Sequence, residues 1–416
     1  MDKTRNFIIH FLSALVLLAV GLLVIFYRYR EIPAHLTWDE LDFTHLAMSL
    51  SNQPYIPYSN LATGHSTLYF YILNTSLKLF GVNSIGLRLP SALFSVGSVI
   101  LLYILFLKVF KNNIAAFAGA LIMETSRWFI NFSRFAFEAP FLLFLELSSL
   151  YFLLKINKNS TLAVIVTAFF VGLAFHSYTP GRIFFLVPLV YLLLMKNKKN
   201  LLIFIAVFLL VISPLLFYLF THTDSRVDAV SVFAQNVSFL RKIEIVLINM
   251  KQTAIMFFKE GDWNGRHNYP GKPAINPLLL VGVLVGLFYS LIHIKQKYNF
   301  LFLLFAAVAF IPALLTIYTQ NPNMLRTYTV LPALAFCVTV VVNTIINTKN
   351  NKHKYIVLSF AFGLILISSL YEIRGYFLYQ STVVKNAFEL TCPLERMVQY
   401  EGRNVPKVCV VKKSSQ

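Results

Sequence analysis

Two adjacent carboxylates, Asp39 and Glu40, follow a long apolar run near the start of the chain, directly after Thr37 and Trp38. A carboxylate can take a proton from an acceptor hydroxyl as a general base, while nearby guanidinium or imidazole groups neutralise a leaving phosphate. Acids close to a membrane are energetically costly, so they indicate a functional site by default. The stretch from Thr37 to Glu40 also has the pattern of a helix capping box, and capping and catalysis are compatible.

The composition places these carboxylates in a membrane protein. Hydrophobic residues make up 57% of the 416 residues and charged residues only 13%, too few to cover the chain with a hydrated surface. Since roughly 20 apolar residues cross a bilayer, the apolar blocks predict an all-α polytopic fold with about 11 transmembrane helices. The expected spans are 7–27, 89–110, 114–132, 138–155, 161–177, 182–195, 200–220, 275–294, 299–318, 326–346 and 355–373. The first lacks the cleavage site of a secretory signal and is expected to be retained.

Lysine placement predicts the orientation of these spans. With Lys3 and Arg5 in the cytoplasm, every second short loop is also cytoplasmic, and these loops are rich in lysine, as the positive-inside rule requires. The lysines concerned are Lys108, Lys111, Lys155, Lys158, Lys196, Lys198, Lys199, Lys295, Lys297, Lys349, Lys352 and Lys354. We therefore expect a multi-pass plasma-membrane protein with a cytoplasmic N-terminus and an extracytoplasmic site.

The same orientation places every arginine except Arg5 outside the cytoplasm. The planar fork of arginine suits carboxylates and phosphates, so an outer arginine cluster beside an acidic pair predicts a phosphate-bearing ligand. Snorkelling of arginines at helix ends is the alternative explanation.

Two long outer loops, 28–88 and 221–274, are expected to carry the site and to contain interfacial helices. The segment from Gly261 to Gly271 in the second loop is rich in Gly, Asn and Pro, which predicts an irregular loop. The transmembrane domain would then comprise residues 1–373, followed by a short extracytoplasmic tail, 374–416.

The tail contains Cys392 and Cys409, which could pair in an oxidising compartment, although their spacing alone does not show it. The sequence has no zinc-type Cys or His spacing and no phosphate-cradling P-loop. We expect no cofactor and no metal-binding residues, and a divalent metal is left open.

Several segments, in their order along the chain, resemble the GT-C superfamily of membrane glycosyltransferases. The resemblance is to glycosyltransferase family 39 in particular, which includes protein O-mannosyltransferases and bacterial aminoarabinose transferases. The similar segments are Asp39-Glu40, His65 to Tyr69, Gly86 to Ala92, Ser133 to Glu138, Gly261 to Gly271, and Pro312 with Arg326 and Pro332. The chain departs from the family where Ser66 and Thr67 replace two prolines, and where Glu138 replaces a frequent Asp.

The resemblance implies a hexosyl- or pentosyltransferase that moves a sugar from a polyprenyl-phosphate donor to an acceptor hydroxyl, with inversion. The acceptor would be a protein, lipid or glycan, and no nucleic acid is expected to bind. By resemblance, Asp39 is the general base, Glu40 orients the acceptor or tunes Asp39, and Glu138 organises the arginines or assists binding. The residues expected at the donor phosphate are His65, Arg88, Arg134, Arg266, His267 and Arg326. Those expected to stack on the sugar or acceptor are Trp38, Tyr69 and Trp263.

Two other classes of protein are open alternatives. A transporter or flippase of a lipid-linked sugar would also need outer arginines and aromatic surfaces. The lack of a two-half repeat, and the concentration of polar groups in outer loops, argue against it. The second alternative is a non-catalytic membrane scaffold.

Overall fold

The computed structural model of the chain describes residues 2–157, 160–348, 351–400, 402 and 404–411. This part of the chain is mainly helical, with one antiparallel ribbon that pairs Tyr58 with Ser66 and Ser59 with His65. Six of its helices are long and apolar enough to cross a membrane, and five apolar helices are shorter. The predicted all-α polytopic membrane fold is confirmed.

The elements fall into three groups. The long apolar helices are α1 (Asp2–Phe26), α4 (Ser84–Phe110), α10 (Lys198–Thr221), α14 (Lys297–Leu314), α15 (Leu331–Asn347, after η5, Tyr328–Val330) and α16 (Asn351–Arg374). The shorter ones are α5 (Asn113–Thr125), α7 (Ala139–Leu153), α8 (Thr161–Phe175), α9 (Leu186–Leu194, after η2, Thr179–Ile183) and α13 (Pro277–Ile292). The rest are α2 (Trp38–Ser49), β1 (Tyr58–Ser59), η1 (Leu61–Thr63), β2 (His65–Ser66), α3 (Leu68–Phe80), α6 (Arg127–Ser133), α11 (Ser225–Val230), η3 (Val232–Ala234), α12 (Phe239–Phe258), η4 (Tyr318–Gln320), η6 (Gly375–Gln380), α17 (Ser381–Ala387), α18 (Leu394–Met397) and η7 (Lys407–Cys409).

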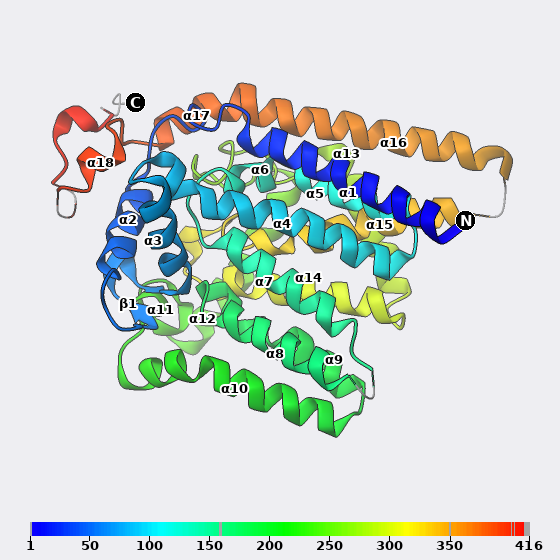
Figure 1. Cartoon of the computed structure of the whole chain (residues 1–416), viewed down its shortest axis with the longest axis horizontal. Helices are drawn as coiled ribbons and strands as arrows, with labels where there is room; N and C mark the ends of the chain where they lie inside the picture. Colours follow the sequence, from blue (N-terminus) through cyan, green and yellow to red (C-terminus); the bar gives the residue numbers. More distant parts are fainter. Residues whose placement is uncertain (1, 158–159, 349–350, 401, 403, 412–416) are drawn as a thin grey trace.

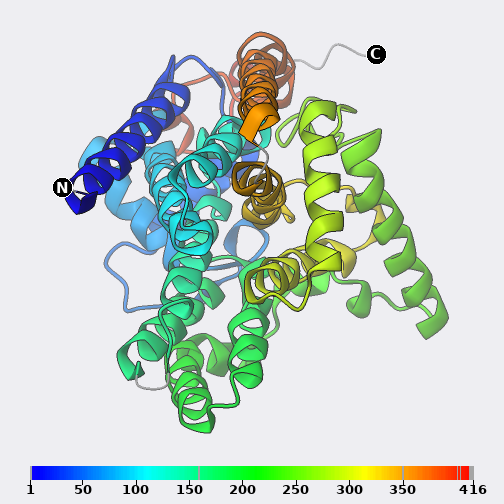
Figure 2. The ribbon, with the colours of Figure 1, turned by 90° about the vertical axis from the view of Figure 1, so that its right-hand side faces the viewer.

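The apolar helices run side by side along the long axis of the molecule (Figure 1). Seen along that axis they form a bundle, with α1 and α13 on opposite flanks (Figure 2). Within the bundle α4 packs against α5 and α7, α8 contacts α7 and α10, and α13 packs on α15.

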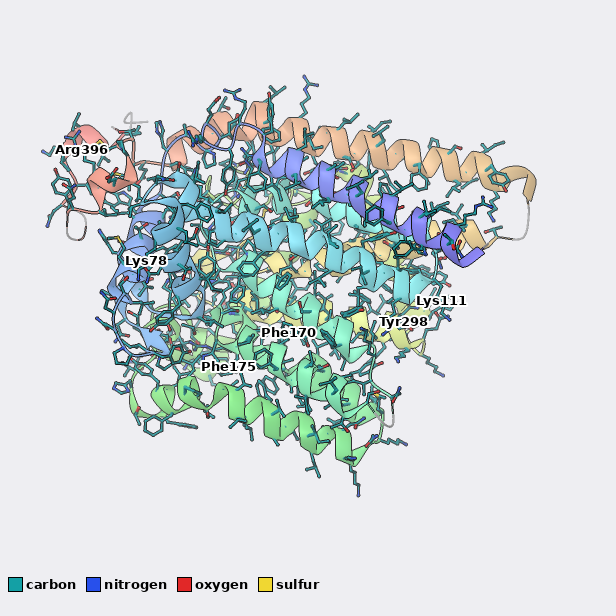
Figure 3. All side chains as sticks on the ribbon, viewed as in Figure 1. Lys78, Lys111, Phe170, Phe175, Tyr298 and Arg396 are labelled. Atoms are coloured by element: carbon teal, nitrogen blue, oxygen red, sulfur yellow. A yellow bond between two sulfur atoms is a disulfide. The ribbon has the colours of Figure 1, made fainter. Side chains whose placement is uncertain are left out.

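The two ends of the bundle differ. The short elements α2, α3, α11 and α18 gather at one end, here called the loop end, and the N-terminus lies at the other (Figure 1). Lys78 and Arg396 mark the loop end, whereas Lys111 and Tyr298 lie at the opposite end (Figure 3). Segments expected on one side of the membrane therefore share one end of the bundle.

Side-chain caps move two helix boundaries away from the predicted ones. The span expected from residue 89 begins at Ser84, because the Asn83 side chain accepts hydrogen bonds from the first free backbone N–H groups. Arg88 thus lies inside α4. The span expected over 114–132 divides at Ser126, whose extended backbone ends α5 and whose hydroxyl caps α6.

The C-terminal region is helical for longer than predicted and then folds back onto the loop end. After α16, a π-helical turn and α17 carry the helix to Ala387. Beyond it, Cys392 and Cys409 form a disulfide. Leu390 exchanges two backbone hydrogen bonds of 2.9 Å with Leu36. The tail is therefore fixed to the segment that leads directly into α2.

Candidate active site

A polar cavity of about 450 Å³ lies between the loops of the loop end. Its walls come from α2, from β2, from the start of α7, from the 262–267 loop and from residues 319–326. These segments are far apart in the sequence, and the fold brings most of the predicted site residues together here. The predicted residues in its wall are Asp39, His65, Glu138, Trp263, Arg266, His267 and Arg326.

Asp39 and Glu40 face different environments because they are neighbours on one helix. Thr37 caps α2: its Oγ1 accepts a 3.0 Å hydrogen bond from Glu40 N, and its own N–H donates to Glu40 Oε2 at 3.1 Å. Adjacent residues on an α-helix diverge by about 100°, since a turn has 3.6 residues. Glu40 accordingly points into the core and is fully buried, whereas the Asp39 side chain lines the cavity and is 38% exposed.

Glu40 forms a buried ion pair with Arg88. Arg88 Nε and Nη2 donate to the two carboxylate oxygens at 2.7 and 3.0 Å, and its remaining bonds go to the carbonyls of Pro33 and His35. Neither side chain lines the polar cavity. The structure therefore does not place Glu40 at a catalytic position or Arg88 at a donor phosphate. Together they fix the segment that enters α2.

Arg134 also lies away from the cavity. It is fully buried, and its guanidinium donates to backbone carbonyls at the end of α1 and just beyond it. The carbonyls belong to Val24, Ile25, Tyr27, Arg28 and Ile32, at 2.5–3.3 Å. The last carbonyls of a helix lack partners within it, so a buried guanidinium can satisfy them. The position of Arg134 indicates this structural role and not the expected phosphate contact.

The three predicted stacking residues are separated. Tyr69 is buried in α3, with its hydroxyl 2.7 Å from Ser91 Oγ, and Trp38 is half-buried against the hydrophobic core. Trp263 is 62% exposed and lines the cavity. Its ring lies against Gly271, where a Cβ would be only 3.0 Å from the indole and φ is +75°. Of the three, Trp263 alone is placed where it could stack on a ligand in this cavity.

Asp39 is paired with Arg266 inside the cavity. Arg266 Nη1 donates to Asp39 Oδ2, and the Arg266 backbone N–H donates to Asn264 Oδ1 at 3.0 Å. Both charged side chains are partly exposed, at 38% for Asp39 and 29% for Arg266. Asp39 Oδ1 makes no hydrogen bond with the residues that the structure describes. One carboxylate oxygen is thus oriented by the protein and the other faces the cavity.

Asp262 was not predicted as a site residue, although it belongs to the Gly261–Gly271 segment. Its buried carboxylate accepts hydrogen bonds from His267 Nδ1 at 2.8 Å, from Met324 N at 2.9 Å and from Asn264 N at 2.8 Å. It therefore ties the 262–267 loop to the 319–326 segment. Because an ionised carboxylate only accepts, His267 carries its proton on Nδ1.

His65 and Glu138 form a second buried pair in the cavity wall. His65 Nδ1 lies 2.5 Å from Glu138 Oε1, and Nε2 lies 2.9 Å from the Ala62 carbonyl. Both ring nitrogens thus face acceptor atoms of the protein. His65 is therefore not free to donate to a phosphate in this state. Glu138 Oε2, by contrast, is buried without a partner among the described residues.

Arg326 keeps a donor for a ligand. The side chain is 8% exposed, its Nη2 donates to Gln320 Oε1, and its Nη1 has no acceptor in the described part of the chain. Burial lowers the pKa of Arg326, yet a guanidinium stays charged in proteins. A buried donor without an acceptor is energetically costly, so this position favours an anion.

Two further residues of the cavity wall were missed from the sequence, Tyr178 and Arg226. Arg226 Nη1 donates to Thr63 Oγ1 at 2.8 Å. Burial raises the pKa of Tyr178 to about 12, so its hydroxyl is a proton donor at neutral pH. The polar run from His222 to Asp228 in the second loop was the available signal for Arg226. Tyr178 had none beyond its place before a Thr-Pro-Gly turn.

No group of three Asp, Glu, His or Cys side chains suited to a metal ion occurs among the described residues. We therefore assign no metal ligands, and independence from a metal stays a prediction.

The chain is similar to known proteins in sequence and in fold. The family model of dolichyl-phosphate-mannose-protein mannosyltransferases matches residues 64–218. ArnT from Cupriavidus metallidurans, solved with undecaprenyl phosphate bound, superposes with a TM-score of 0.59 at 13% identity, over 92% of this chain and 78% of ArnT. The chain therefore has a GT-C fold.

A second GT-C structure, the oligosaccharyltransferase of Archaeoglobus fulgidus in its apo form, gives a TM-score of 0.58 at 14% identity. The match covers 90% of this chain but only 56% of the archaeal one, so the chain spans little more than half of that protein. The archaeal oligosaccharyltransferase AglB, solved with an inhibitory peptide and a dolichol-phosphate, gives a TM-score of 0.54 at 13% identity. No curated protein matches the sequence.

Proposed function

We propose that the chain is a glycosyltransferase that moves a sugar from a lipid-phosphate donor to an acceptor hydroxyl, with inversion at the anomeric carbon. The observation that carries the proposal is the polar cavity itself. It holds one partly exposed carboxylate, Asp39, together with three arginines, Arg226, Arg266 and Arg326. The carboxylate can take the proton that the acceptor hydroxyl loses, and the arginines can neutralise the negative charge that develops on the leaving phosphate.

The proposed step follows from these groups. Asp39 takes the proton of the acceptor hydroxyl as its oxygen bonds to the anomeric carbon. The bond from that carbon to the phosphate oxygen breaks, and its electron pair leaves with the lipid phosphate. Cavity arginines neutralise the charge that develops on this phosphate. Glu138 Oε2, buried without a partner, accepts a hydrogen bond from a substrate hydroxyl, and Trp263 stacks on a sugar or aglycone face.

We further propose that the cavity faces the extracytoplasmic side. The lysines of the opposite end support this orientation through the positive-inside rule. The disulfide between Cys392 and Cys409 at the loop end supports it independently, because disulfides persist in oxidising compartments.

The reaction class is tested by following both products. Purified full-length protein is given a radiolabelled polyprenyl-phosphate sugar and candidate acceptors. We expect free polyprenyl phosphate to appear in step with the glycosylated acceptor, and the new linkage to have the anomeric configuration opposite to that of the donor. Movement of intact donor across vesicles, with no release of polyprenyl phosphate, would instead identify a transporter.

A further inference from the structure

A buried side chain outside the polar cavity, Asn131 of α6, is bonded to the loop that carries Arg266 and His267. Its Nδ2 group donates to the backbone carbonyls of Arg266 at 2.8 Å and of His267 at 3.3 Å. Asn131 is 1% exposed and does not line the polar cavity. It therefore contacts the loop through the loop backbone, whereas Arg266 reaches Asp39 through its side chain.

A second buried amide fixes the orientation of Asn131. Gln380, fully buried in the π-helical turn η6, donates from Nε2 to Asn131 Oδ1 at 2.7 Å. Because a carbonyl oxygen only accepts hydrogen bonds, Asn131 must present its NH₂ group to the loop and its oxygen to Gln380. The two amides thus connect η6 to the loop in one defined orientation, and η6 also packs on α6.

The C-terminal helix is bonded to α6 at a second point. Glu372, near the end of α16, accepts from the Arg127 backbone N–H at 2.9 Å and from Asn276 Nδ2 at 3.0 Å. Residues eight apart in a straight α-helix are offset by about 80° around its axis. The π-helical turn, whose hydrogen bonds run from i to i+5, is wider and reduces this offset. Glu372 and Gln380 can therefore both face α6.

The next helix, α17, packs directly on the loop at Gly265. A Cβ built on Gly265 would lie 2.9 Å from Ala387 Cβ and 3.6 Å from Val383 Cγ1. The first distance is well below the separation of about 3.5–4.0 Å at which carbon atoms pack. Glycine at this position therefore lets the loop and α17 approach each other closely.

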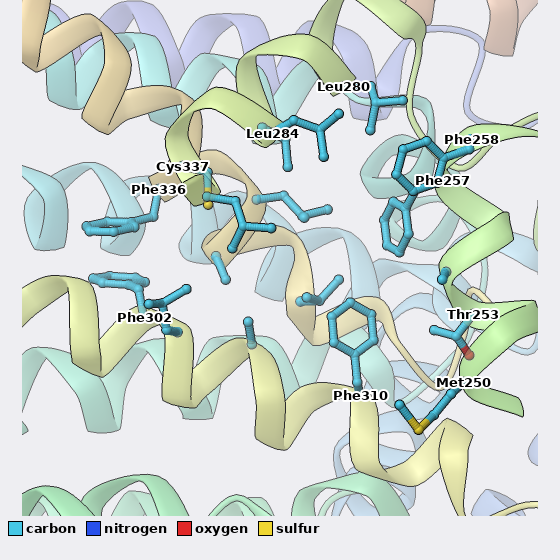
Figure 4. A pocket seen from close by; sticks show the side chains of 18 of the residues that line it. Met250, Thr253, Phe257, Phe258, Leu280, Leu284, Phe302, Phe310, Phe336 and Cys337 are labelled. Carbon is cyan, nitrogen blue, oxygen red and sulfur yellow. The ribbon is translucent and has the colours of Figure 1, made fainter. Parts of the chain in front are cut away.

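The helices that flank the loop in the sequence give it less support. α12 packs on α14 and α13 packs on α15, and residues of all four helices line an apolar cavity of about 340 Å³. Phe257 and Phe258 of α12 and Leu280 and Leu284 of α13 are among its walls (Figure 4). A cavity lined by α12 and α13 holds the two ends of the loop less firmly than direct packing of the two helices would.

We propose that Asn131 and Gln380, together with α17, are positioning elements for sugar transfer, because they hold the loop where the Arg266 guanidinium orients Asp39. This inference rests on the proposed function. It assigns part of the active-site geometry to a C-terminal region that lines no part of the polar cavity. The tail beyond α17 is bonded to the segment before α2. The C-terminal region thus contacts both elements that carry the Asp39–Arg266 pair.

The kinetic test uses variants of nearly unchanged shape. Gln380→Met and Asn131→Leu remove the amide hydrogen bonds and keep most of the side-chain volume. Displacement of a group at the reacting centre by about 1 Å can cost about a hundredfold in rate, so we expect kcat to fall by about tenfold to a hundredfold. The KM for the sugar donor should stay within about twofold of wild type, because no side chain in the cavity is changed.

The matched control is Asn299→Leu at the opposite end of the bundle, next to Tyr298 (Figure 3). Asn299 is also buried, and its Nδ2 group donates to the His293 carbonyl at 3.1 Å. This variant should keep the wild-type kcat. A loss as large as that of Gln380→Met would show only a general need for buried amides and would overturn the proposal. A folded Gln380→Met protein with wild-type kcat would also overturn it.

A second pair of variants tests the α17 contact without removing a hydrogen bond. Gly265→Ala should lower kcat by about tenfold, because its methyl group meets Ala387 and displaces the loop. Ala387→Gly removes the atom that this methyl group meets, so the double variant should recover most of the lost rate. A folded double variant that stays as slow as Gly265→Ala would contradict the proposal. This pair also decides the question if Gln380→Met does not fold.

Hydrogen exchange separates this inference from the proposed function, because it needs no substrate. Gln380→Met should speed exchange of the backbone amides of residues 264–268 by about tenfold and leave those of α8 unchanged. If the wild-type protein transfers no sugar, the proposed function fails, and exchange still shows whether the two amides hold the loop. If it transfers sugar and exchange in the loop of the variant is unchanged, the positioning role fails and the proposed function stands.

Discussion

At the scale of single residues, the site depends on which side of a helix or loop each charged group occupies. Asp39 faces the cavity and Glu40 the core, although they are adjacent in sequence. The same division separates the cavity arginines from Arg88 and Arg134, whose guanidinium groups are engaged by protein acceptors. A charged residue in this chain therefore lines the cavity or supports the fold according to its partners, not its type.

The buried Glu40–Arg88 pair gives the first prediction. Arg88→Met leaves the Glu40 carboxylate buried and unpaired, which should cost about 3–5 kcal/mol of stability. The double variant with Glu40→Leu should recover most of the loss, because no charge is then left unpaired. Melting temperatures in detergent check both expectations. Arg88→Met with a wild-type melting temperature and weakened donor binding would restore Arg88 to the phosphate site.

Asp224 gives a prediction about acid. Burial opposes its ionisation, but the Arg182 guanidinium outweighs that effect and holds the pKa of Asp224 below its usual range. A depressed folded pKa stabilises the fold above the unfolded value of about 3.9 and loses that effect as the pH falls through the folded value. Asp224→Asn should thus lower the melting temperature at pH 7, with a gap from wild type that narrows below about pH 4. A gap that is constant with pH would exclude the ion pair as its cause.

Sequence reasoning could find the acids and arginines of the outer loops but not their partners. Asp39, Arg266, His267, Arg326 and Trp263 were all predicted and lie in one cavity. Arg134 was assigned to a phosphate because its partners, the carbonyls that end α1, lie more than 100 residues away and carry no side-chain signal. Tyr178 was missed because only the tertiary fold brings η2 against the loops.

At the scale of elements, the C-terminal tail stabilises the segment that positions α2. Leu390 pairs with Leu36 on one side and with Val410 on the other, and the disulfide closes this unit. His45 on α2 lies 3.3 Å from the Val398 carbonyl, a second contact between tail and helix. The helices could be predicted from apolar runs. The pairing of the tail with the segment before α2 could not, because it is made by backbone groups, which every residue has.

Removal of the disulfide tests the tail. The bridged cysteines are 17 residues apart, and closing a loop of this size contributes about 3 kcal/mol. Cys392→Ser with Cys409→Ser should lower the melting temperature and reduce transfer, and a reductant should do the same to wild type. Cys337→Ser, which removes the free buried cysteine, is the control for reductant sensitivity. If the double serine variant is assayed well below its own melting temperature and still has full transfer activity, the tail does not position α2.

At the scale of the whole molecule, the two ends of the bundle have different chemistry. The loop end carries the polar cavity and the disulfide, and the other end carries the N-terminus (Figure 1) and Lys111 (Figure 3). The fold class followed from composition and from the length of the apolar runs, because a bilayer restricts such a chain to membrane-crossing helices. The location of the cavity between seven separate segments required the tertiary structure.

Orientation gives a whole-molecule prediction. In a Cys337→Ser background, a membrane-impermeant maleimide should label Lys78→Cys in intact cells and Lys111→Cys only after the membrane is opened. The two positions mark opposite ends of the bundle (Figure 3). Labelling in the reverse order would place the cavity in the cytoplasm.

The most direct test of the account concerns Asp39. Asp39→Asn keeps the size of the side chain and removes its capacity as a base. Sugar transfer should therefore fall by about 10²–10⁴-fold, while the melting temperature and the affinity for a lipid phosphate stay close to wild type. Asp228 is an exposed residue of α11 that does not line the polar cavity, and the Asp228→Asn variant should transfer at the wild-type rate. A folded Asp39→Asn protein that transfers sugar as fast as wild type would contradict the account.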